Sequence, residues 1–497
     1  MSALSVAEAY HQATKYDPAS GTACPSRIDW SRQPLPFKEY PGARRVPLGR
    51  FLPETQEDLG DRQLRGRDRL DASAVGLNDL SHLLYFSGGV TEIVGLPGGP
   101  RFMRAAPSAG ALYPTEIYVV SRGRTDLADG VYNYQVRTHA LACAAEGDRW
   151  PELEDACFDH PALEGGDLAI VLAGVYQRSA WRYGERAYRR ILLDTGHVLG
   201  NLVLYAPLVD RRAVPIGGFA DASLNACIGL DVDAEAALVV LTLPRGPGRF
   251  EPVALPSSCG WTQAGLVTGM EALHQASCIP AGSRPAALPP AVLEPRLWLP
   301  DVAGERLEGP RLEWLDDLSK TLLERRSARA FSGVPCTRAQ LATVLYHACS
   351  PPGLFDPARM EIFVAIHRVA GLDPGCYHYD PATSRMRQVR SKDLRAEVQF
   401  LCLDQELGRA AAAVVFHAAD LGRAVARWGE RAYRYLHLDA GHVGERLNLG
   451  ALHVGLGASG IGGFYDDQVN DRLGIPGDLA TLYITALGVP LAGPGGS

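Results

Sequence analysis

The strongest constraint on this chain is a long internal repeat. The segment Tyr183-Gly-Glu-Arg-Ala-Tyr-Arg189 recurs as Trp428-Gly-Glu-Arg-Ala-Tyr-Arg434, at an offset of 245 residues (428 − 183). The same offset maps further pieces onto each other: Asp194, Gly196 and His197 onto Asp439, Gly441 and His442; Glu116 onto Glu361; Gly130–Tyr134 onto Gly375–Tyr379; and Ile216–Phe219 onto Ile461–Phe464. A period this long excludes a solenoid and indicates the tandem duplication of a whole domain.

The duplication predicts how the chain is divided. Its 497 residues correspond to about two to four domains by length alone. We expect an extended N-terminal arm over residues 1–53, one domain over 54–250, a linker over 251–310 and a second domain over 311–497. The linker segment is dense in Pro, Gly and Ala and predicts one helix near residues 265–274.

Composition excludes several classes of function. The net charge is −7, from 49 basic and 56 acidic residues, which does not fit a nucleic-acid-binding surface. No apolar run reaches the roughly 18 residues of a membrane span, and the first ten residues do not resemble a secretion signal. The ten cysteines form no C-x-x-C pair, and there is no tight His/Cys cluster. We therefore expect free thiols, no metal site and a cytoplasmic location.

Hydrophobic patterning predicts an α+β fold in each half. Apolar, β-branched runs predict buried strands at 116–120, 167–173, 238–243 and 482–486. Leucines and alanines at helical spacing predict helices near 312–323 and 341–348. Long helices are expected over 185–208 and 430–456, and their internal Gly196 and Gly441 predict close packing between helices. His197 and His442 occupy equivalent positions in these helices, which favours a structural role.

Three motifs carry a resemblance to a known family. Arg325–Phe331 (Arg-Arg-Ser-Ala-Arg-Ala-Phe) follows an amphipathic segment, Pro107–Glu116 (Pro-Ser-Ala-Gly-Ala-Leu-Tyr-Pro-Thr-Glu) leads into a strand, and Gly460–Asp466 (Gly-Ile-Gly-Gly-Phe-Tyr-Asp) follows a long helix. With these motifs the chain resembles the nitroreductase superfamily, most closely its SagB-type branch of thiazoline and oxazoline dehydrogenases. The likeness spans nearly the whole chain apart from the linker.

The resemblance implies both a fold and a cofactor. In each domain it implies a central, mostly antiparallel sheet flanked by helices. It also implies FMN bound at a two-fold interface, where each partner lends part of each site. Because this chain holds two such domains, we expect them to form a pseudo-dimer within one chain.

Three segments are the candidate FMN-binding residues. They are Arg325, Arg326, Ser327 and Arg329; Pro107, Ser108, Ala109 and Gly110; and Ile461, Gly462 and Gly463. Arginine suits the flavin phosphate because its guanidinium forms bidentate, charge-assisted hydrogen bonds. Glycine lets the backbone approach a flat ring, so the glycines are expected at the ring edge and the Pro-Ser-Ala-Gly loop over the other face. Taken without the family, the same segments also fit a solvated basic turn and two tight turns.

The candidate catalytic residues lie where this chain departs from the family. SagB-type enzymes carry a Lys-Tyr pair, implicated in catalysis, just before the Gly-Glu-Arg segment; this chain has Arg182-Tyr183 in one half and Arg427-Trp428 in the other. Arginine stays protonated and is a poor general base. Tyr183 is therefore the candidate base, and Arg182 is the candidate anchor for a substrate carboxylate or for negative charge. An exposed helix charge is the alternative interpretation of Arg182.

The two halves have lost different parts of the site. An offset of 261 (326 − 65) aligns Arg326–Arg329 with Arg65–Asp68, where a glycine replaces the serine and an aspartate replaces the second arginine. Conversely, Pro107–Ala111 aligns with the degraded segment Pro352–Asp356. If sites are shared between halves, both losses fall on the same site, and we predict one FMN per chain.

These observations favour an FMN-dependent oxidoreductase. The expected reaction takes a hydride from a C–H next to nitrogen in an amino-acid- or peptide-derived substrate, such as an azoline, in a natural-product pathway. The substrate is expected to be a small molecule or peptide, with partner biosynthetic enzymes. Two alternatives remain: an NAD(P)H-dependent nitro or quinone reductase, and a flavin-free scaffold that binds a peptide or a partner enzyme.

Overall fold

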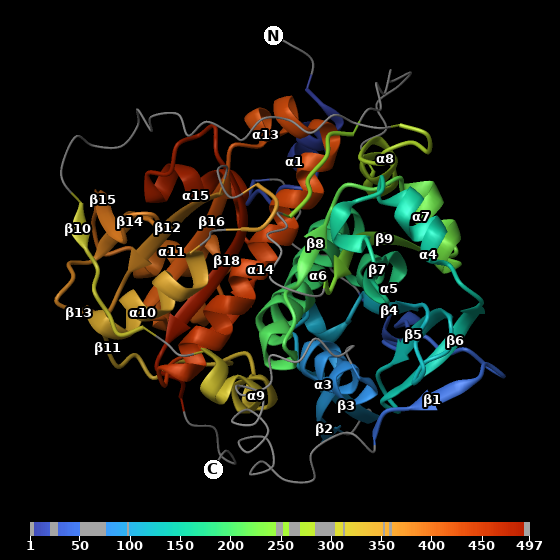
Figure 1. The fold of residues 1–497 in the computed structure, drawn as a ribbon. Coiled ribbons are helices and arrows are strands. Elements are labelled where there is room, and N and C mark those ends of the chain that lie inside the picture. Colours follow the sequence, from blue (N-terminus) through green and yellow to red (C-terminus); the bar gives the residue numbers. More distant parts are fainter. Residues whose placement is uncertain are drawn as a thin grey trace.

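The computed structural model shows one seven-stranded antiparallel sheet in each half of the chain (Figure 1). It describes residues 4–19, 28–49, 76–96, 99–244, 252–257, 269–283, 304–311, 314–350, 353–356 and 360–491. The strand order is β1-β6-β5-β4-β7-β9-β8 in the first sheet and β10-β15-β14-β12-β16-β18-β17 in the second. The two orders correspond strand by strand, which confirms the duplication and the α+β fold.

The strands of the first sheet are β1 (Arg45–Pro47), β4 (Thr115–Ser121), β5 (Gly130–Gln135), β6 (Ala140–Glu146), β7 (Leu168–Val175), β8 (Val214–Ile216) and β9 (Glu235–Thr242). Those of the second are β10 (Glu305–Arg306), β12 (Met360–Ile366), β14 (Gly375–Asp380), β15 (Arg385–Ser391), β16 (Ala413–Ala419), β17 (Gly457–Ile461) and β18 (Ala480–Gly488). Two short pairs stand apart: β2 (Val90–Leu96) with β3 (Gly99–Arg104), and β11 (Cys336–Thr337) with β13 (Val369–Ala370). All four strands predicted from the sequence are present.

The helices of the first half are α1 (Val6–Ala13), α3 (Leu77–Gly88), α4 (Trp150–Ala156), α5 (Tyr176–Tyr183), α6 (Ala187–Tyr205) and α7 (Asp221–Ile228). Those that follow are α8 (Met270–Ala276), α9 (Trp314–Glu324), α10 (Arg338–Cys349), α11 (Arg395–Leu401), α12 (Glu406–Ala410), α13 (Leu421–Trp428), α14 (Ala432–His453) and α15 (Asp466–Leu473). The helix predicted near 265–274 is α8, which begins a few residues later than expected.

Each sheet is buried on both faces because its side chains alternate between two layers of helices. In the first half, Ile117 and Val119 of β4 pack with α3 and α6, whereas Tyr118 and Val120 pack with α4 and α7. In the second half, α10 and α14 cover one face, and α11, α12 and α15 cover the other. The layer that contains α6 and α14 forms one core continuous through both halves.

The two halves meet along α6 and α14, which lie side by side at the centre of the molecule (Figure 1). At the crossing, a Cβ on Gly196 would overlap the Leu438 carbonyl oxygen, and a Cβ on Gly441 would overlap the Leu193 carbonyl oxygen. Any larger residue would force the helices apart. The predicted close packing at these two glycines is therefore confirmed.

The stretch Tyr176–Val209, which contains α6, passes a length-and-hydropathy test for a membrane span. However, 78% of its most apolar window is buried inside the molecule. Burial of this kind is what a helix at the centre of a shared core requires, so its apolar character has a structural explanation.

The N-terminal arm of the first half is clasped by residues of both halves (Figure 1 shows α1 beside α13). Asp466 of the second half forms buried ion pairs with Arg186 (2.8 Å) and Arg189 (2.7 Å) of the first. Arg186 Nη1 also donates to the Thr14 carbonyl oxygen (2.6 Å), just after α1. The carboxylate of Glu430 accepts from backbone amides at the start of α1, including that of Ala7 (2.7 Å).

An equivalent clasp holds the segment predicted as a linker. Asp221 pairs with Arg431 (2.7 Å) and Arg434 (2.6 Å). Arg431 Nη1 donates to the Ser277 carbonyl oxygen (2.9 Å), just after α8, and Glu185 accepts from the first amide of α8 (2.6 Å). Part of residues 251–310 thus serves as the arm of the second half.

Candidate active site

A cavity of about 380 Å³ opens at the interface between the halves. This volume lies within the range of small-molecule sites, which is about 300–1,000 Å³. The first half contributes the loop after β3 and residues of α5 and α6, while the second half contributes the segment after α9 and residues of β17 and β18. The lining residues are Trp30, Arg101, Met103, Pro107, Ser108, Ala109, Gly110, Ala111, Tyr113, Arg182, Arg190, Leu193, Asp194, His197, Arg325, Ser327, Arg329, Ser459, Gly460, Gly462 and Tyr483.

The Pro-Ser-Ala-Gly loop is held in place by a carboxylate on α6. The Ser108 hydroxyl donates to Asp194 Oδ2 (2.5 Å), and the Ala109 amide donates to the same carboxylate (3.2 Å). Gly110 then adopts a left-handed conformation (φ 66°) that favours glycine. Burial raises the pKa of Asp194 to about 7, although Ser108 and Ala109 act in the opposite direction. Asp194 therefore fixes the loop that forms one wall of the cavity.

The arginine segment after α9 divides its side chains between two faces. Arg325, Ser327 and Arg329 line the cavity, as predicted. Arg325 is buried and donates to the carbonyl oxygens of Ala105 (2.5 Å) and Arg104 (3.0 Å), and its Nη1 has no hydrogen-bond partner within the described part of the chain. An unpaired guanidinium nitrogen beside a cavity is a position at which an anion would bind.

The predicted role of Arg326 is not supported by its position and needs correction. Its guanidinium pairs with Glu92 (2.6 Å) and donates to Thr91 Oγ1 (3.2 Å), both on β2 outside the cavity. The segment after α9 belongs to neither a helix nor a strand, and its side chains are divided between the cavity and β2. Positions 325, 327 and 329 share one face, and position 326 points to the other.

The glycine segment at the end of β17 is only partly exposed to the cavity. Gly462 lines it, and a Cβ there would overlap Arg190 Nη1. Ile461 is buried in the core of the second half. Gly463 contacts Leu403 and lies beside Arg190 Nη2, 3.8 Å from the position of a Cβ. Neither Ile461 nor Gly463 is among the described residues that line the cavity.

The candidate catalytic pair lies against the Pro-Ser-Ala-Gly loop. The Tyr183 hydroxyl is 2.8 Å, and Arg182 Nη1 is 3.0 Å, from the position that a Cβ on Gly110 would take. The guanidinium carbon of Arg190 lies 3.9 Å from the centre of the Tyr183 ring, in a cation–π arrangement. Arg182 lines the cavity, whereas Tyr183 is not among the described residues that line it; the Tyr183 hydroxyl lies beside Gly110, which does.

Several lining residues escaped prediction from the sequence, notably Arg190, Trp30 and Tyr483. His197, expected to be structural, also lines the cavity, and burial lowers its pKa to about 3 so that its ring is neutral. The signal for Arg190 was present in the repeat, because its counterpart 245 residues later is Tyr435 rather than arginine. A difference between two otherwise matching halves marks a position where they have diverged.

Charge makes this cavity suited to anions. Its lining contains five arginines, Arg101, Arg182, Arg190, Arg325 and Arg329, and one acidic residue, Asp194. The Asp194 carboxyl accepts hydrogen bonds from the loop, and a single carboxyl cannot balance the charge of five arginines. The unpaired Arg325 Nη1 and the glycine backbone at Gly462 together fit a ligand that has a flat ring and a phosphate group, such as FMN.

The pseudo-equivalent position in the other half is filled by side chains. The offset of 245 residues replaces Gly110 by Phe355 and Arg190 by Tyr435. The two aromatic rings are stacked, with centres 5.4 Å apart, against Gly217, the counterpart of Gly462. Leu255 packs on the next glycine, and its amide donates to the Tyr435 hydroxyl (3.0 Å). The aligned segment Arg65–Asp68 and residue Pro352 lie outside the described residues.

The loop on that side nevertheless keeps its anchor. Asp439, the counterpart of Asp194, accepts hydrogen bonds from the backbone amides of Leu354 (2.7 Å) and Asp356 (2.9 Å). Trp428, the counterpart of Tyr183, donates its indole N–H to Asp356 Oδ2 (2.8 Å). The scaffold of the site is thus present twice, while its open space is lost on one side.

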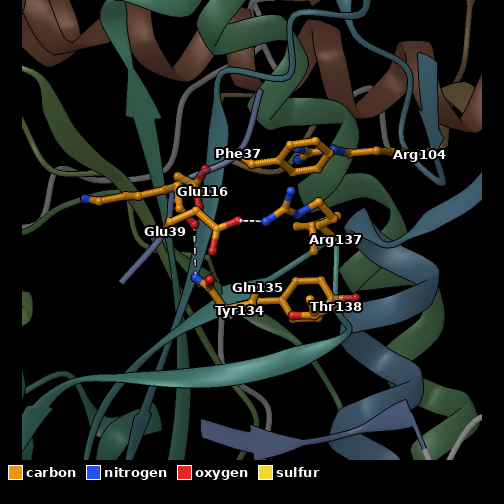
Figure 2. A pocket seen from close by; sticks show the side chains of 10 residues that line it. Phe37, Glu39, Arg104, Glu116, Tyr134, Gln135, Arg137 and Thr138 are labelled. Atoms are coloured by element: carbon orange, nitrogen blue, oxygen red, sulfur yellow. Dashed lines mark hydrogen bonds and ion pairs between the residues drawn. The ribbon is translucent and has the colours of Figure 1, made fainter. Parts of the chain in front are cut away.

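A second pocket lies between the N-terminal arm and β5, and Figure 2 shows its lining. Phe37 lies beside the buried Arg104, whose guanidinium carbon is 5.3 Å from the ring centre, and Arg137 pairs with Glu39 (2.6 Å). Its volume is about 10 Å³, close to the space of a single water. This pocket therefore attaches the arm to the first sheet and is too small for a ligand.

Within the described residues, no group of three His, Cys, Asp or Glu side chains is placed to hold a metal ion. The described residues that line the interhalf cavity supply arginines, hydroxyl groups, a buried carboxyl and a neutral imidazole.

The chain belongs to the nitroreductase family, whose model matches residues 67–246 and 322–489, one range in each half. A crystal structure of a protein from Anabaena variabilis, described as a nitroreductase, superimposes with a TM-score of 0.85 and 42% sequence identity, over 98% of this chain and 100% of that one. The whole two-domain arrangement is therefore shared with a solved structure.

Two relatives each match a little under a third of this chain. A Methanocaldococcus jannaschii protein named as a nitroreductase is 31% identical over 150 residues, which are 30% of this chain and 72% of the relative. The microcin B17-processing protein McbC of Escherichia coli is 27% identical over 157 residues, which are 29% of this chain and 54% of McbC. The match thus spans about half the length of McbC. Family and relatives together support an oxidoreductase.

Proposed function

We propose that this chain is an FMN-dependent oxidoreductase that takes a hydride from a C–H next to nitrogen in an amino-acid- or peptide-derived substrate. An azoline is such a substrate, and a natural-product pathway is the setting that the relationship to McbC supports. The observation that carries the proposal is the interhalf cavity. It combines Arg325, Arg329 and Gly462 of the second half with the Pro-Ser-Ala-Gly loop of the first in one cationic space.

The residues divide into those that would hold the cofactor and those that would act on the substrate. Arg325, Ser327 and Arg329 would bind the phosphate, and Gly462 and the loop at Ser108 would lie against the ring. When bound, FMN supplies the hydride acceptor. The protein then contributes by holding the reacting carbon close to that acceptor in a fixed orientation.

Proton removal is assigned to the tyrosine beside Gly110. The Tyr183 ring packs on the Arg190 guanidinium, and its hydroxyl lies beside the Gly110 backbone. A hydroxyl in this position can accept or pass on the proton that leaves the neighbouring ring carbon when the carbon next to nitrogen loses its hydride. Arg182, beside it, stays protonated and is suited to binding rather than to base catalysis.

The proposal extends to location and partners. We propose a cytoplasmic enzyme that works on a peptide or small molecule with other biosynthetic enzymes, since McbC is named for processing microcin B17. Dioxygen is one candidate acceptor for the electrons that the substrate gives up.

An absorption spectrum of the purified protein, after incubation with FMN and removal of the excess, tests the proposal. A bound-flavin spectrum is expected, and a protein that stays colourless would contradict it and favour the scaffold hypothesis. Anaerobic titration then separates the remaining possibilities. Bleaching of the flavin by NADPH or NADH would favour the reductase alternative, the activity for which the Anabaena protein is named. Bleaching by an azoline peptide alone supports the dehydrogenase.

A further inference from the structure

The cavity contains more positive charge than one flavin phosphate needs. Arg325, Ser327 and Arg329 come from the second half and form the predicted phosphate group. Arg182 and Arg190 come from α5 and α6 of the first half and form a separate pair. A phosphate carries close to two negative charges, so it would balance the first group and leave the second pair unbalanced.

In the part of the chain that the structure describes, no carboxylate is hydrogen-bonded or ion-paired to this second pair, although Asp194 lies close enough to Arg190 for their charges to interact. Across the described ranges, the structure gives neither Arg182 nor Arg190 a hydrogen bond or ion pair with a carboxylate. Arg190 is only 7% exposed, and its Nε is buried without a partner. The nearest cavity carboxyl, Asp194, already accepts hydrogen bonds from Ser108 and Ala109. A buried cation without a partner is costly, and an anionic ligand would remove that cost.

Both guanidinium groups are held in place by aromatic rings. The guanidinium carbon of Arg190 lies 3.9 Å from the Tyr183 ring centre, and that of Arg182 lies 5.7 Å from the Trp30 ring centre. The close contact on Tyr183 restricts the Arg190 guanidinium, and the looser cation–π contact with Trp30 leaves the Arg182 N–H groups able to reach a ligand. Arg182 Nη1 lies at the Gly110 backbone and Arg190 Nη1 at the Gly462 backbone, on two walls of the same cavity.

We propose that Arg182 and Arg190 together bind a carboxylate of the substrate, so that the enzyme acts on anionic substrates that bear a free carboxylate close to the reacting carbon. This inference rests on the proposed function and narrows its substrate class. A planar carboxylate matches the fork of guanidinium N–H groups. The pair is specific to this site, because the other half has Tyr435 in place of Arg190.

Benzoate and its neutral isostere benzamide serve as probes. Each is titrated into the FMN-loaded protein, and binding is read from the change in flavin absorbance, with calorimetry on the flavin-free protein as an independent measurement. We expect benzoate to bind and benzamide to bind much more weakly. Arg182→Gln and Arg190→Gln should each weaken benzoate binding by about tenfold or more, as expected for loss of a charge-assisted hydrogen bond.

Arg427→Gln is the matched control, because Arg427 is the counterpart of Arg182 in the other half. It should leave benzoate affinity unchanged. Equal affinity for benzoate and benzamide, or benzoate binding that both cavity variants leave intact in correctly folded protein, would overturn the proposal. The proposal would also be overturned if inorganic phosphate bound through Arg182 and Arg190 but benzoate did not, because the pair would then be a phosphate-binding site for a nucleotide. A protein that stays colourless with FMN would refute the proposed flavin binding. Calorimetry on the flavin-free protein would still test whether Arg182 and Arg190 bind a carboxylate.

Discussion

Single buried side chains at this interface have unusual titration properties. Glu445 on α14 is fully buried, 3.9 Å from Arg325 Nε. Burial raises its pKa to about 8, and the nearby Arg325 only partly offsets this. The carboxyl is therefore protonated in the folded protein at neutral pH. In the folded protein this carboxyl ionises only at alkaline pH, whereas in the unfolded chain it ionises near pH 4.

Replacing Glu445 by glutamine should therefore change how stability depends on pH. The folded state holds the Glu445 proton more tightly than the unfolded state does. Between roughly pH 5 and 8, Glu445 therefore lowers the wild-type free energy of unfolding by about 1.4 kcal/mol for each unit that the pH rises. The Glu445→Gln variant has no such pH-dependent loss of stability. The difference between its Tm and the wild-type Tm should therefore increase as the pH rises from 5 to 8. Calorimetry at pH 5 and 8 measures this. Glu271→Gln, at an exposed position on α8, is the control, and a Tm difference that does not vary with pH would contradict the prediction.

A second residue-scale prediction concerns the candidate base. Tyr183→Phe keeps the ring on which Arg190 stacks but removes the hydroxyl. FMN should stay bound, and kcat should fall by about 100-fold or more, as for loss of a general base. Steady-state oxidation of an azoline peptide measures it. Trp428→Phe, at the counterpart position, should leave kcat unchanged, and an undiminished kcat in Tyr183→Phe would remove Tyr183 from the mechanism.

At the same scale, the sequence identified backbone features of the site better than its side chains. The loop Pro107–Gly110 and Gly462 were predictable because glycine and proline act locally on the chain. Arg190 was not, since the face of a long helix that lines a cavity depends on how α6 packs against α14. Arg326 points away from the cavity, which was not predictable because the motif alone does not reveal which of its side chains face inward.

Among the elements, the two clasps explain why Gly-Glu-Arg-x-x-Arg is repeated. In each copy the glutamate binds the start of an arm helix, and both arginines bind one aspartate of the opposite half. The arms themselves repeat: Glu8-Ala-Tyr-His-Gln-Ala-Thr14 matches Glu271-Ala-Leu-His-Gln-Ala-Ser277. This second repeat has an offset of 263 (271 − 8) rather than 245, so a search at one fixed offset misses it.

Removing the centre of one clasp should destabilise the whole fold. Asp466→Ala leaves Arg186 and Arg189 buried without their anion, which should lower the free energy of unfolding by about 3–5 kcal/mol. Asp221→Ala should cost a similar amount, because it centres the equivalent clasp. Urea unfolding followed by circular dichroism measures both. Asp467→Ala, whose carboxylate is 60% exposed, is the control, and a loss no larger than that of the control would refute the clasp model.

For the molecule as a whole, the duplication predicts one flavin per chain. The position pseudo-equivalent to the cavity is filled by the stacked rings of Phe355 and Tyr435. Arg329→Ala should release the flavin from the remaining site, because it removes a predicted phosphate ligand. Asp68→Ala, outside the described residues, should not affect binding. Flavin released on denaturation, divided by protein concentration, measures the ratio, and a value near two would contradict the asymmetry.

The whole-molecule arrangement was largely predictable, because a repeated pattern of buried strands and helices specifies the same fold twice. Comparing the copies also predicts which half keeps the arginines and which keeps the Pro-Ser-Ala-Gly loop. What could not be predicted was the filling of the second position, since Leu255 reaches it from a segment without periodicity.

Joining both halves through α6 and α14 in one polypeptide has a kinetic and thermodynamic consequence. In a dimer of separate chains, dilution dissociates the subunits and dismantles any site that they share. Here the second half is always present at the high effective concentration that a covalent connection provides. The completeness of the interhalf cavity is therefore independent of how much of the protein a cell contains, so even a few copies per cell would each carry an assembled site.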